Sequence, residues 1–178
     1  MHAGVPVLAA APGIVIGVRD GAPDTGRTKE NAAAIKGKEC GNGIRVDHED
    51  GWTTQYCHLK QGSVTVEPGE LVQAGDTLGK VGKSGSATFP HLHFSLRKYG
   101  EQVDPFNPNP DQTCATANPI GLWQDPPDYR PGGLISIGLF DRIPKYAEVK
   151  QGTPHLTHLS RDLPILALWS YSFGTQKD

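Results

Sequence analysis

Glycine and proline are unusually abundant in this chain, and their abundance limits the folds it can adopt. The 178 residues include 22 glycines and 15 prolines. Helix interiors tolerate both poorly, glycine because of its backbone freedom and proline because it lacks an N–H and clashes with the preceding turn. A helical bundle is therefore disfavoured, and a protein of short strands and turns is favoured.

The charge balance excludes a polybasic surface. Lysine and arginine total 17 against 19 aspartates and glutamates, which gives a formal net charge of -2. This balance gives no electrostatic reason to expect nucleic-acid or anionic-membrane binding. The longest apolar stretch, Val5 to Val18, is interrupted by proline and glycine and is shorter than the roughly 20 residues that cross a bilayer. We expect no transmembrane segment and no signal peptide in this chain.

Short apolar runs separated by turn residues predict antiparallel β-structure in the first part of the chain. Their number and spacing are typical of a sheet, a sandwich or a barrel. Residues 20–39 are polar, with one short helical possibility at Thr28–Ile35, and we interpret them as a surface insertion. The expected strands are Val5–Leu8, Ile14–Arg19, the two arms of a hairpin within 43–58, and then 63–67, 71–72, 77–81 and 91–98.

A change in composition divides the chain into three expected parts. Residues 1–106 form the main β domain, and the proline-rich stretch 107–132 is interpreted as a linker or a meandering cover. Two more strands are expected at Leu134–Phe140 and Pro164–Phe173. Because two strands alone cannot bury enough surface, the tail 133–178 either packs on the main domain or begins a second, truncated one.

Two of the three cysteines are expected to form a disulfide. Cys40 and Cys57 flank a predicted hairpin with its turn at 49–51. If its arms pair about that turn, residues whose numbers sum to about 97–99 face each other, and these two cysteines satisfy that sum. The alternative is a pair of reduced, buried thiols. A disulfide would place the protein outside the reducing cytosol, and the remaining Cys114 suggests a partner absent from this chain.

Strict alternation of apolar and polar residues places two histidines on one face of a strand. The apolar side chains between His91 and Arg97 would point into the core, and His91 and His93 would point the other way. Cα atoms two residues apart on a strand lie about 6.7 Å from each other. Both imidazoles can therefore address one small site, as metal ligands or as acid–base groups. The alternative is a pair of surface histidines.

A third histidine can join this pair. If strand 53–58 lies in the same sheet, His58 can reach the surface that carries the other two. Taken alone, His58 is typical of a half-buried histidine bonded to a backbone carbonyl. His48 at the hairpin turn is expected to be solvated, and His155 and His158 in the unpatterned tail are expected to be surface residues.

Several segments follow one another in an order and spacing that match a known family. They are Gly4–Val7, 9–10, Gly13–Val15, Gly41–Gly43, Val46–His48, Tyr56–Leu59, Val66–Gly82, 85–86 and Pro90–Phe94. Together they resemble the lysostaphin/LytM-type zinc endopeptidases, which cut peptide cross-bridges in bacterial peptidoglycan. The resemblance covers residue 4 to about residue 106. It implies an all-β domain built on a curved antiparallel sheet, resembling a partly open barrel, with a metal site in a groove across it.

The resemblance also implies roles for the three histidines. His93 corresponds to a Zn²⁺ ligand. His58 and His91 correspond to the two catalytic histidines, which orient or deprotonate the zinc-bound water and stabilise the tetrahedral intermediate. The implied partner is peptidoglycan or a peptide substrate, and the implied location is the bacterial periplasm or exterior.

One part of the family pattern is absent. Family members carry two further zinc ligands in an HxxxD motif shortly before the segment matched by Gly4–Val7. The chain begins three residues before Gly4, and His2 does not match the register of that motif. We therefore expect a piece of a longer protein or a start codon assigned too late, with weak zinc binding and little hydrolysis.

Three functions are left open. The first is a zinc endopeptidase acting on peptidoglycan. The second, which the missing ligand pair favours, is a non-catalytic module that binds or regulates cell-wall hydrolases. The third arises because Val66–Gly82 resembles half of a biotinyl or lipoyl carrier domain, but no lysine stands at a hairpin tip beside a methionine.

Overall fold

The computed structural model describes residues 3–108, 121–125, 132–150, 156–158 and 160–173. The chain divides into two compact units, Met1–Pro127 and Asp128–Asp178. None of the helices in the described ranges has the length and apolar character needed to cross a membrane.

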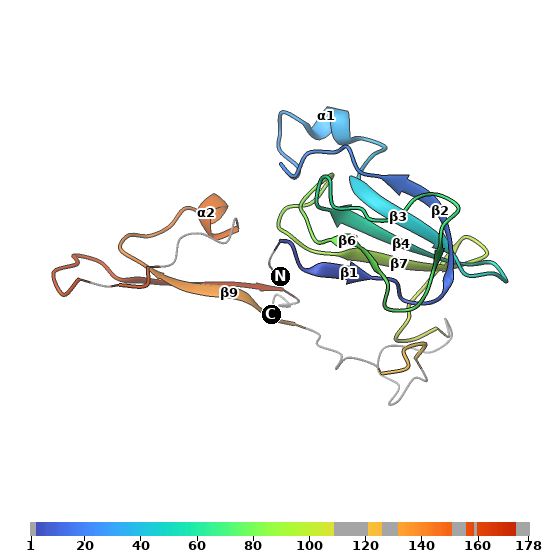
Figure 1. Cartoon of the computed structure of the whole chain (residues 1–178). Coiled ribbons are helices and arrows are strands. Elements are labelled where there is room, and N and C mark those ends of the chain that lie inside the picture. Colours follow the sequence, from blue (N-terminus) through green and yellow to red (C-terminus); the bar gives the residue numbers. More distant parts are fainter. Residues whose placement is uncertain (1–2, 109–120, 126–131, 151–155, 159, 174–178) are drawn as a thin grey trace. The chain divides into compact units, whose positions relative to one another are not determined.

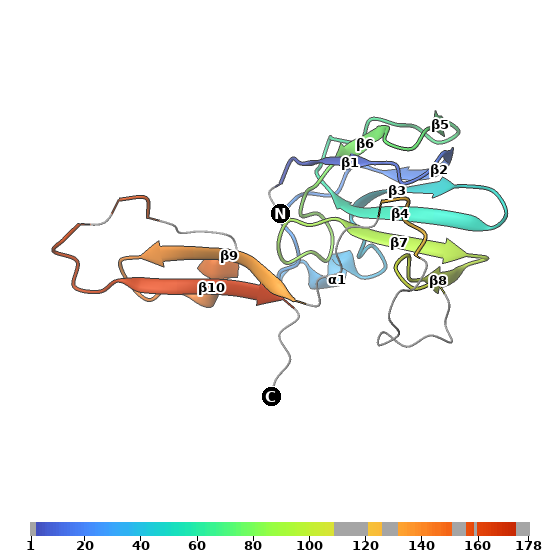
Figure 2. The same cartoon turned by 90° about the horizontal axis from the view of Figure 1, so that it is seen from below.

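The first unit is almost entirely β-structure. Its elements are β1 (Pro6–Leu8), β2 (Gly13–Arg19), α1 (Ala32–Ile35), β3 (Asn42–Asp47), β4 (Trp52–Leu59), β5 (Leu71–Val72), β6 (Thr77–Lys80), β7 (His93–Lys98) and β8 (Glu101–Val103). Six strands form one antiparallel sheet in the order β5-β2-β3-β4-β7-β8, and β1 pairs separately with β6 (Figures 1 and 2). The sheet has two free ends and is not closed into a barrel. The predicted all-β antiparallel fold is confirmed.

The core lies between one face of the large sheet and the β1–β6 pair. Apolar residues alternate along the strands, so that Ile44 and Val46 of β3 and Tyr56 of β4 share the inward face. Val7 of β1 and Leu78 of β6 belong to the same buried cluster. The opposite face of the sheet is left for polar side chains, and the candidate site lies there.

Three details of the predicted strands are wrong. The strand expected at 91–98 begins only at His93, so His91 lies outside it. Residues 63–67 form no strand. They are attached to β6 through Thr65, whose backbone N–H donates to the Leu78 carbonyl and whose hydroxyl donates to the Thr77 carbonyl. The turn ending at Gly69 follows directly, so a ladder cannot continue. In addition, the short edge strand β8 was not expected; it pairs with β7 across a turn that includes Tyr99 and Gly100, both with positive φ.

The predicted disulfide between Cys40 and Cys57 is confirmed, but the register argument for it is wrong. In the hairpin, Gly43 and not Cys40 lies opposite Cys57. Cys40 lies before β3, in a turn where the Gly41 N–H donates to the Lys38 carbonyl. The Cys40 carbonyl accepts a hydrogen bond from the His58 N–H. This turn brings the two Cα atoms to 4.8 Å.

The second unit contains a two-stranded antiparallel sheet and one short helix. Its elements are β9 (Gly133–Phe140), α2 (Tyr146–Lys150) and β10 (Ala167–Phe173). Both strands were expected, although β10 begins three residues after Pro164. Trp169 is buried, whereas Leu134 and Leu168 are exposed. The predictions for His2, Cys114 and His155 fall outside the described residues.

A short part of the expected linker belongs to the first unit. The ring of Trp123 lies 5.8 Å from that of Phe94 and 5.9 Å from that of Phe106, measured between ring centroids. The Leu122 N–H donates to the Pro105 carbonyl. Residues 121–125 therefore lie against the first unit at β7 and the segment that follows β8.

Candidate active site

A β-bulge in β4 decides where the His58 side chain lies. Cys57 pairs directly with His93 of β7, and neighbouring residues of a regular strand point to opposite faces. Regular alternation would therefore separate His58 from His93. The pairing with β3 shifts at this point and leaves His58 as an extra residue, and its φ is +63°. Such a bulge re-aims the side chain, here towards the face that carries His93.

The three imidazoles lie together. The ring centroids of His58 and His91 are 4.8 Å apart, and those of His58 and His93 are 5.8 Å apart. His93 opens β7, and His91 lies in the segment just before that strand. The structure therefore brings together the three histidines that the strand pattern selected.

Hydrogen bonds orient two of these rings in the same way. His58 Nδ1 lies 2.9 Å from the Ser84 carbonyl, and His91 Nδ1 lies 2.8 Å from the Phe89 carbonyl. A carbonyl oxygen only accepts, so each Nδ1 carries the proton and a neutral ring keeps its lone pair on Nε2. His93 differs, because its Nε2 lies 3.2 Å from the Ser95 hydroxyl.

Burial keeps His58 neutral. The residue is only 7% exposed, and this desolvation lowers its pKa below the ordinary value of 6.5. The bond to Ser84 acts in the opposite direction, and repulsion from His91 and His93 lowers the pKa further. A neutral imidazole with a free lone pair at neutral pH is suited to accept a proton.

A buried polar network fixes the loop that orients His58. The Ser84 hydroxyl donates to the Leu59 carbonyl and accepts from the Asn42 N–H. The Asn42 side-chain amide donates to the carbonyls of Leu59 and Ala22. Asn42 and Ser84 are both completely buried. Sequence reasoning did not identify them, although each stands beside glycines, in Gly-Asn-Gly and in Lys-Ser-Gly.

Two glycines let this loop approach β3. Gly41 and Gly85 both have φ near +67°, and a Cβ on Gly41 would lie 2.5 Å from the Gly85 nitrogen. Only glycine adopts such a conformation at so close a backbone contact without strain. The approach matters because the Ser84 carbonyl that orients His58 lies directly beside this contact.

A polar hollow lies on the outer face of the sheet beside the histidines. Its volume is about 320 Å³ and its walls include His58, His93 and the disulfide, but not His91. Gln55, Ser95 and Arg97 also line it, and the Arg97 guanidinium donates to the Gln55 side-chain oxygen at 3.1 Å. The hollow therefore offers both donors and acceptors to a peptide backbone.

Two other histidines lie apart from this group. His48 was expected to be solvated, but this prediction is wrong. Its Nδ1 lies 2.7 Å from the Pro12 carbonyl and its Nε2 lies 2.7 Å from the Thr54 hydroxyl, so both ring nitrogens are bonded and the residue is half-buried. His158 is exposed, as expected.

The imidazoles do not constitute a metal centre by themselves. Over the described ranges, no group of three or more histidine, cysteine, aspartate or glutamate residues could hold a metal ion. Catalytic zinc sites normally have three protein ligands. The residues described here therefore do not fit a resident zinc ion.

Comparison with known proteins gives a consistent picture. The model of peptidase family M23 matches residues 1–105. The DD-carboxypeptidase/endopeptidase Mpg of Neisseria meningitidis is 31% identical over 117 residues, or 63% of this chain. The peptidoglycan DD-endopeptidase ShyA of Vibrio cholerae is 28% identical over 109 residues, or 61% of this chain. The matches span only 22% and 21% of these relatives' own lengths.

Among solved structures, the catalytic domain of a prophage-encoded M23 protein from Enterococcus faecalis, crystallised as a point mutant, is similar to this chain. The two are 27% identical, with a TM-score of 0.46, and the match covers 59% of this chain and 70% of that domain.

Proposed function

Because the chain belongs to peptidase family M23, we propose that it acts on peptide cross-links of bacterial peptidoglycan. The names of its relatives in Neisseria and Vibrio support this substrate class. The observation that carries the proposal is the convergence of His58, His91 and His93, with ring centroids 4.8 and 5.8 Å apart beside an open polar hollow.

His58 and His91 are proposed as the acid–base pair. Each ring is fixed by its Nδ1 bond to a backbone carbonyl, which leaves Nε2 to accept a proton. Burial keeps His58 neutral, so its Nε2 lone pair is free to accept a proton, and His91, whose ring centroid lies 4.8 Å away, is proposed as its partner in proton transfer. Gln55, Ser95 and Arg97 are proposed to hold the peptide backbone along the hollow.

His93 is proposed as a Zn²⁺ ligand, on the resemblance to the zinc endopeptidases. Since the described residues offer no set of three ligands, we propose that residues 1–178 bind zinc weakly and hydrolyse cross-links slowly. The family and the disulfide also support a periplasmic or extracellular location.

The test is release of cross-link cleavage products from purified peptidoglycan by the full chain in excess zinc, with zinc stoichiometry measured in parallel. We expect slow cleavage that is lost in His58→Gln, His91→Gln and His93→Gln and retained in His158→Gln, a change at an exposed residue. Tight equimolar zinc with fast turnover would refute weak binding. Unchanged cleavage in the three active-site variants would refute the assignment of the site.

A non-catalytic role is the second candidate, and the missing ligand set favours it. In that case the same hollow would bind cell-wall peptides, or the domain would regulate another hydrolase, without cleavage. The same experiment separates the two functions: binding of peptidoglycan with no product in excess zinc supports the module, and product formation excludes it.

A further inference from the structure

The polar hollow beside the histidines continues along the outer face of the sheet. A second hollow shares Cys40 and Gln55 with it and extends to Arg19. Arg19 also lines a third cavity, of about 420 Å³, whose other walls come from the insertion that carries α1 and from Gly85. The three hollows therefore form one row, from His58 and His93 at one end to the insertion at the other.

Strand register gives the length of this row. Arg19 lies opposite Gly43, Gly43 opposite Cys57, and Cys57 opposite His93. Directly opposed residues share a face of the sheet, so the Arg19 and His93 side chains start from the same surface. Three strand spacings separate them, or about 14 Å, which is the length of roughly four extended residues.

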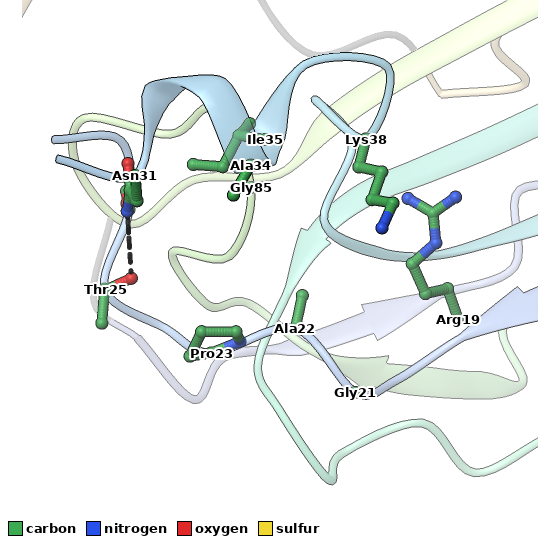
Figure 3. A pocket seen from close by; sticks show the side chains of 11 residues that line it. Arg19, Gly21, Ala22, Pro23, Thr25, Asn31, Ala34, Ile35, Lys38 and Gly85 are labelled. Carbon is green, nitrogen blue, oxygen red and sulfur yellow. Dashed lines mark hydrogen bonds between the residues drawn. The ribbon is translucent and has the colours of Figure 1, made fainter. Parts of the chain in front are cut away.

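Two cations stand at the far end of the row. Arg19 and Lys38 both line the third cavity and are exposed, and Figure 3 shows their side chains ending at the same side of it. Within the described residues neither has a carboxylate at ion-pair distance. The Arg19 guanidinium makes one long bond, of 3.4 Å, to the Gly41 carbonyl.

The insertion's own carboxylates bond to groups other than these two cations, although Glu39 also lines the polar hollow beside the histidines. Three of them accept backbone N–H bonds, and these bonds fasten or shape the insertion. They run from Gly62 and Val64 to Asp20, from Gln61 and Lys83 to Asp24, and from Gly37 to Glu39. The fourth, Glu30, bonds to the Thr28 side chain. The two cations are thus left for an anion from outside the chain.

We propose that Arg19 and Lys38 form a subsite for a carboxylate of the peptide that occupies the groove, about four residues from the histidines. This inference rests on the proposed function, because it takes the groove to hold a peptide. A carboxylate fits because a guanidinium and an ammonium together offer several charge-assisted donors to its two oxygens. The apolar wall that Ala22, Pro23 and Ile35 contribute beside them suits small aliphatic side chains next to that carboxylate.

A peptide is favoured over a phosphate polymer by the continuity of the groove. The cations lie in one row with the histidines and with Gln55, which can bond a peptide backbone. Arg45 and Arg97 also line the row, but Glu39, Gln55 and the histidines stand among the cations. The row is therefore not the uninterrupted positive surface that a phosphate polymer would need.

Equilibrium binding to the metal-free full chain tests the subsite without hydrolysis. The probes are a short N-acetylated peptide ending in D-Ala-D-Ala with a free carboxylate and the same peptide as its C-terminal amide. We expect the acid to bind about tenfold more tightly than the amide, because the amide loses the charge-assisted bonds. The double variant Arg19→Gln/Lys38→Gln should bind both probes equally, with its fold checked by circular dichroism.

Two further variants keep the test sharp. Lys36→Gln removes one charge from the same insertion outside the cavity and should keep the preference for the acid. Arg19→Lys/Lys38→Arg keeps both charges and should also keep it. The inference is overturned if the acid fails to bind the wild-type chain, if the double glutamine variant keeps the preference, or if a glycerol phosphate polymer displaces the acid and binds more tightly.

Peptidoglycan cleavage tests the proposed function, and the binding preference for the acid tests the subsite. His93→Gln should lose peptidoglycan cleavage and keep the preference for the acid. An absence of cleavage products from the wild-type chain refutes hydrolysis alone, whereas equal binding of acid and amide refutes the subsite alone.

Discussion

The β3–β4 hairpin of the first unit and the β9–β10 pair of the second are both antiparallel, yet their surroundings differ. Ile44, Val46 and Tyr56 of the first are at most 1% exposed. In the second, Leu134 is 65% exposed and Leu168 76% exposed. Antiparallel pairing alone does not bury a strand; a second layer does, and in the first unit β1 and β6 supply it.

Matched leucines test this comparison with the largest expected effect. Leu78→Ala removes a fully buried side chain from β6 and should lower the free energy of unfolding by about 2–5 kcal/mol. Leu168→Ala removes an exposed one from β10 and should change it by less than about 0.5 kcal/mol. Chemical denaturation measures both; similar losses for the two leucines would mean that the contrast in burial is wrong.

Removal of the disulfide should affect the first unit next most strongly. The bond closes a loop between residues 17 apart, and loops near this size contribute about 3 kcal/mol by restricting the unfolded chain. Cys40→Ser/Cys57→Ser should therefore lower the melting temperature, in an experiment that compares both proteins with and without a reducing agent. If the double serine variant and the oxidised wild type have the same melting temperature, the disulfide does not stabilise the protein in solution.

A smaller loss of stability is expected when the buried polar network of Asn42 and Ser84 is broken. Asn42→Ala leaves the buried Ser84 hydroxyl in place but removes the amide bonds to Ala22 and Leu59, at a cost of about 1–3 kcal/mol. Asn31→Ala on the exposed insertion is the matched control, with an expected change below that range. Equal destabilisation by the two substitutions would contradict a special role for the buried network.

The smallest effect concerns the ion pair of the second unit. The Arg142 guanidinium lowers the pKa of Glu148 from 4.5 to about 2. This pair therefore stabilises the folded unit above pH 4.5, and the contribution is lost as the pH falls towards about 2. An NMR titration should find this depressed pKa and its return towards 4.5 in Arg142→Gln; an ordinary value in the wild type would count against the pair.

Sequence patterns predicted most of the strands and the outward face of His93 because alternation and turn residues are local signals, whereas His91 lies in the segment before β7. They could not predict how His58 reaches its neighbours, because its turn depends on a bulge in the pairing with β3. They found the Cys40–Cys57 bond for the wrong reason, since the hairpin register depends on the left-handed turn residues Glu49 and Asp50 as well as Gly51.

Asn42 and Ser84, which support the site, could not be predicted from the sequence for a different reason. Asn42 and Ser84 act through bonds between segments 42 residues apart, and no local pattern reports such a contact. His48 was misplaced likewise, because its bonds to Pro12 and Thr54 join three separate strands or turns. Local periodicity thus predicts faces of strands, whereas the polar network that arranges the site is non-local.

The most direct test of the account is a ¹⁵N NMR titration of the imidazole rings in the metal-free chain. The site requires His58 to be a neutral base with its proton on Nδ1, held by the Ser84 carbonyl. We predict that the Nδ1–H tautomer of His58 persists and that this ring protonates below the ordinary pKa of 6.5. A His58 ring that carries its proton on Nε2, or that protonates at or above 6.5, would contradict it.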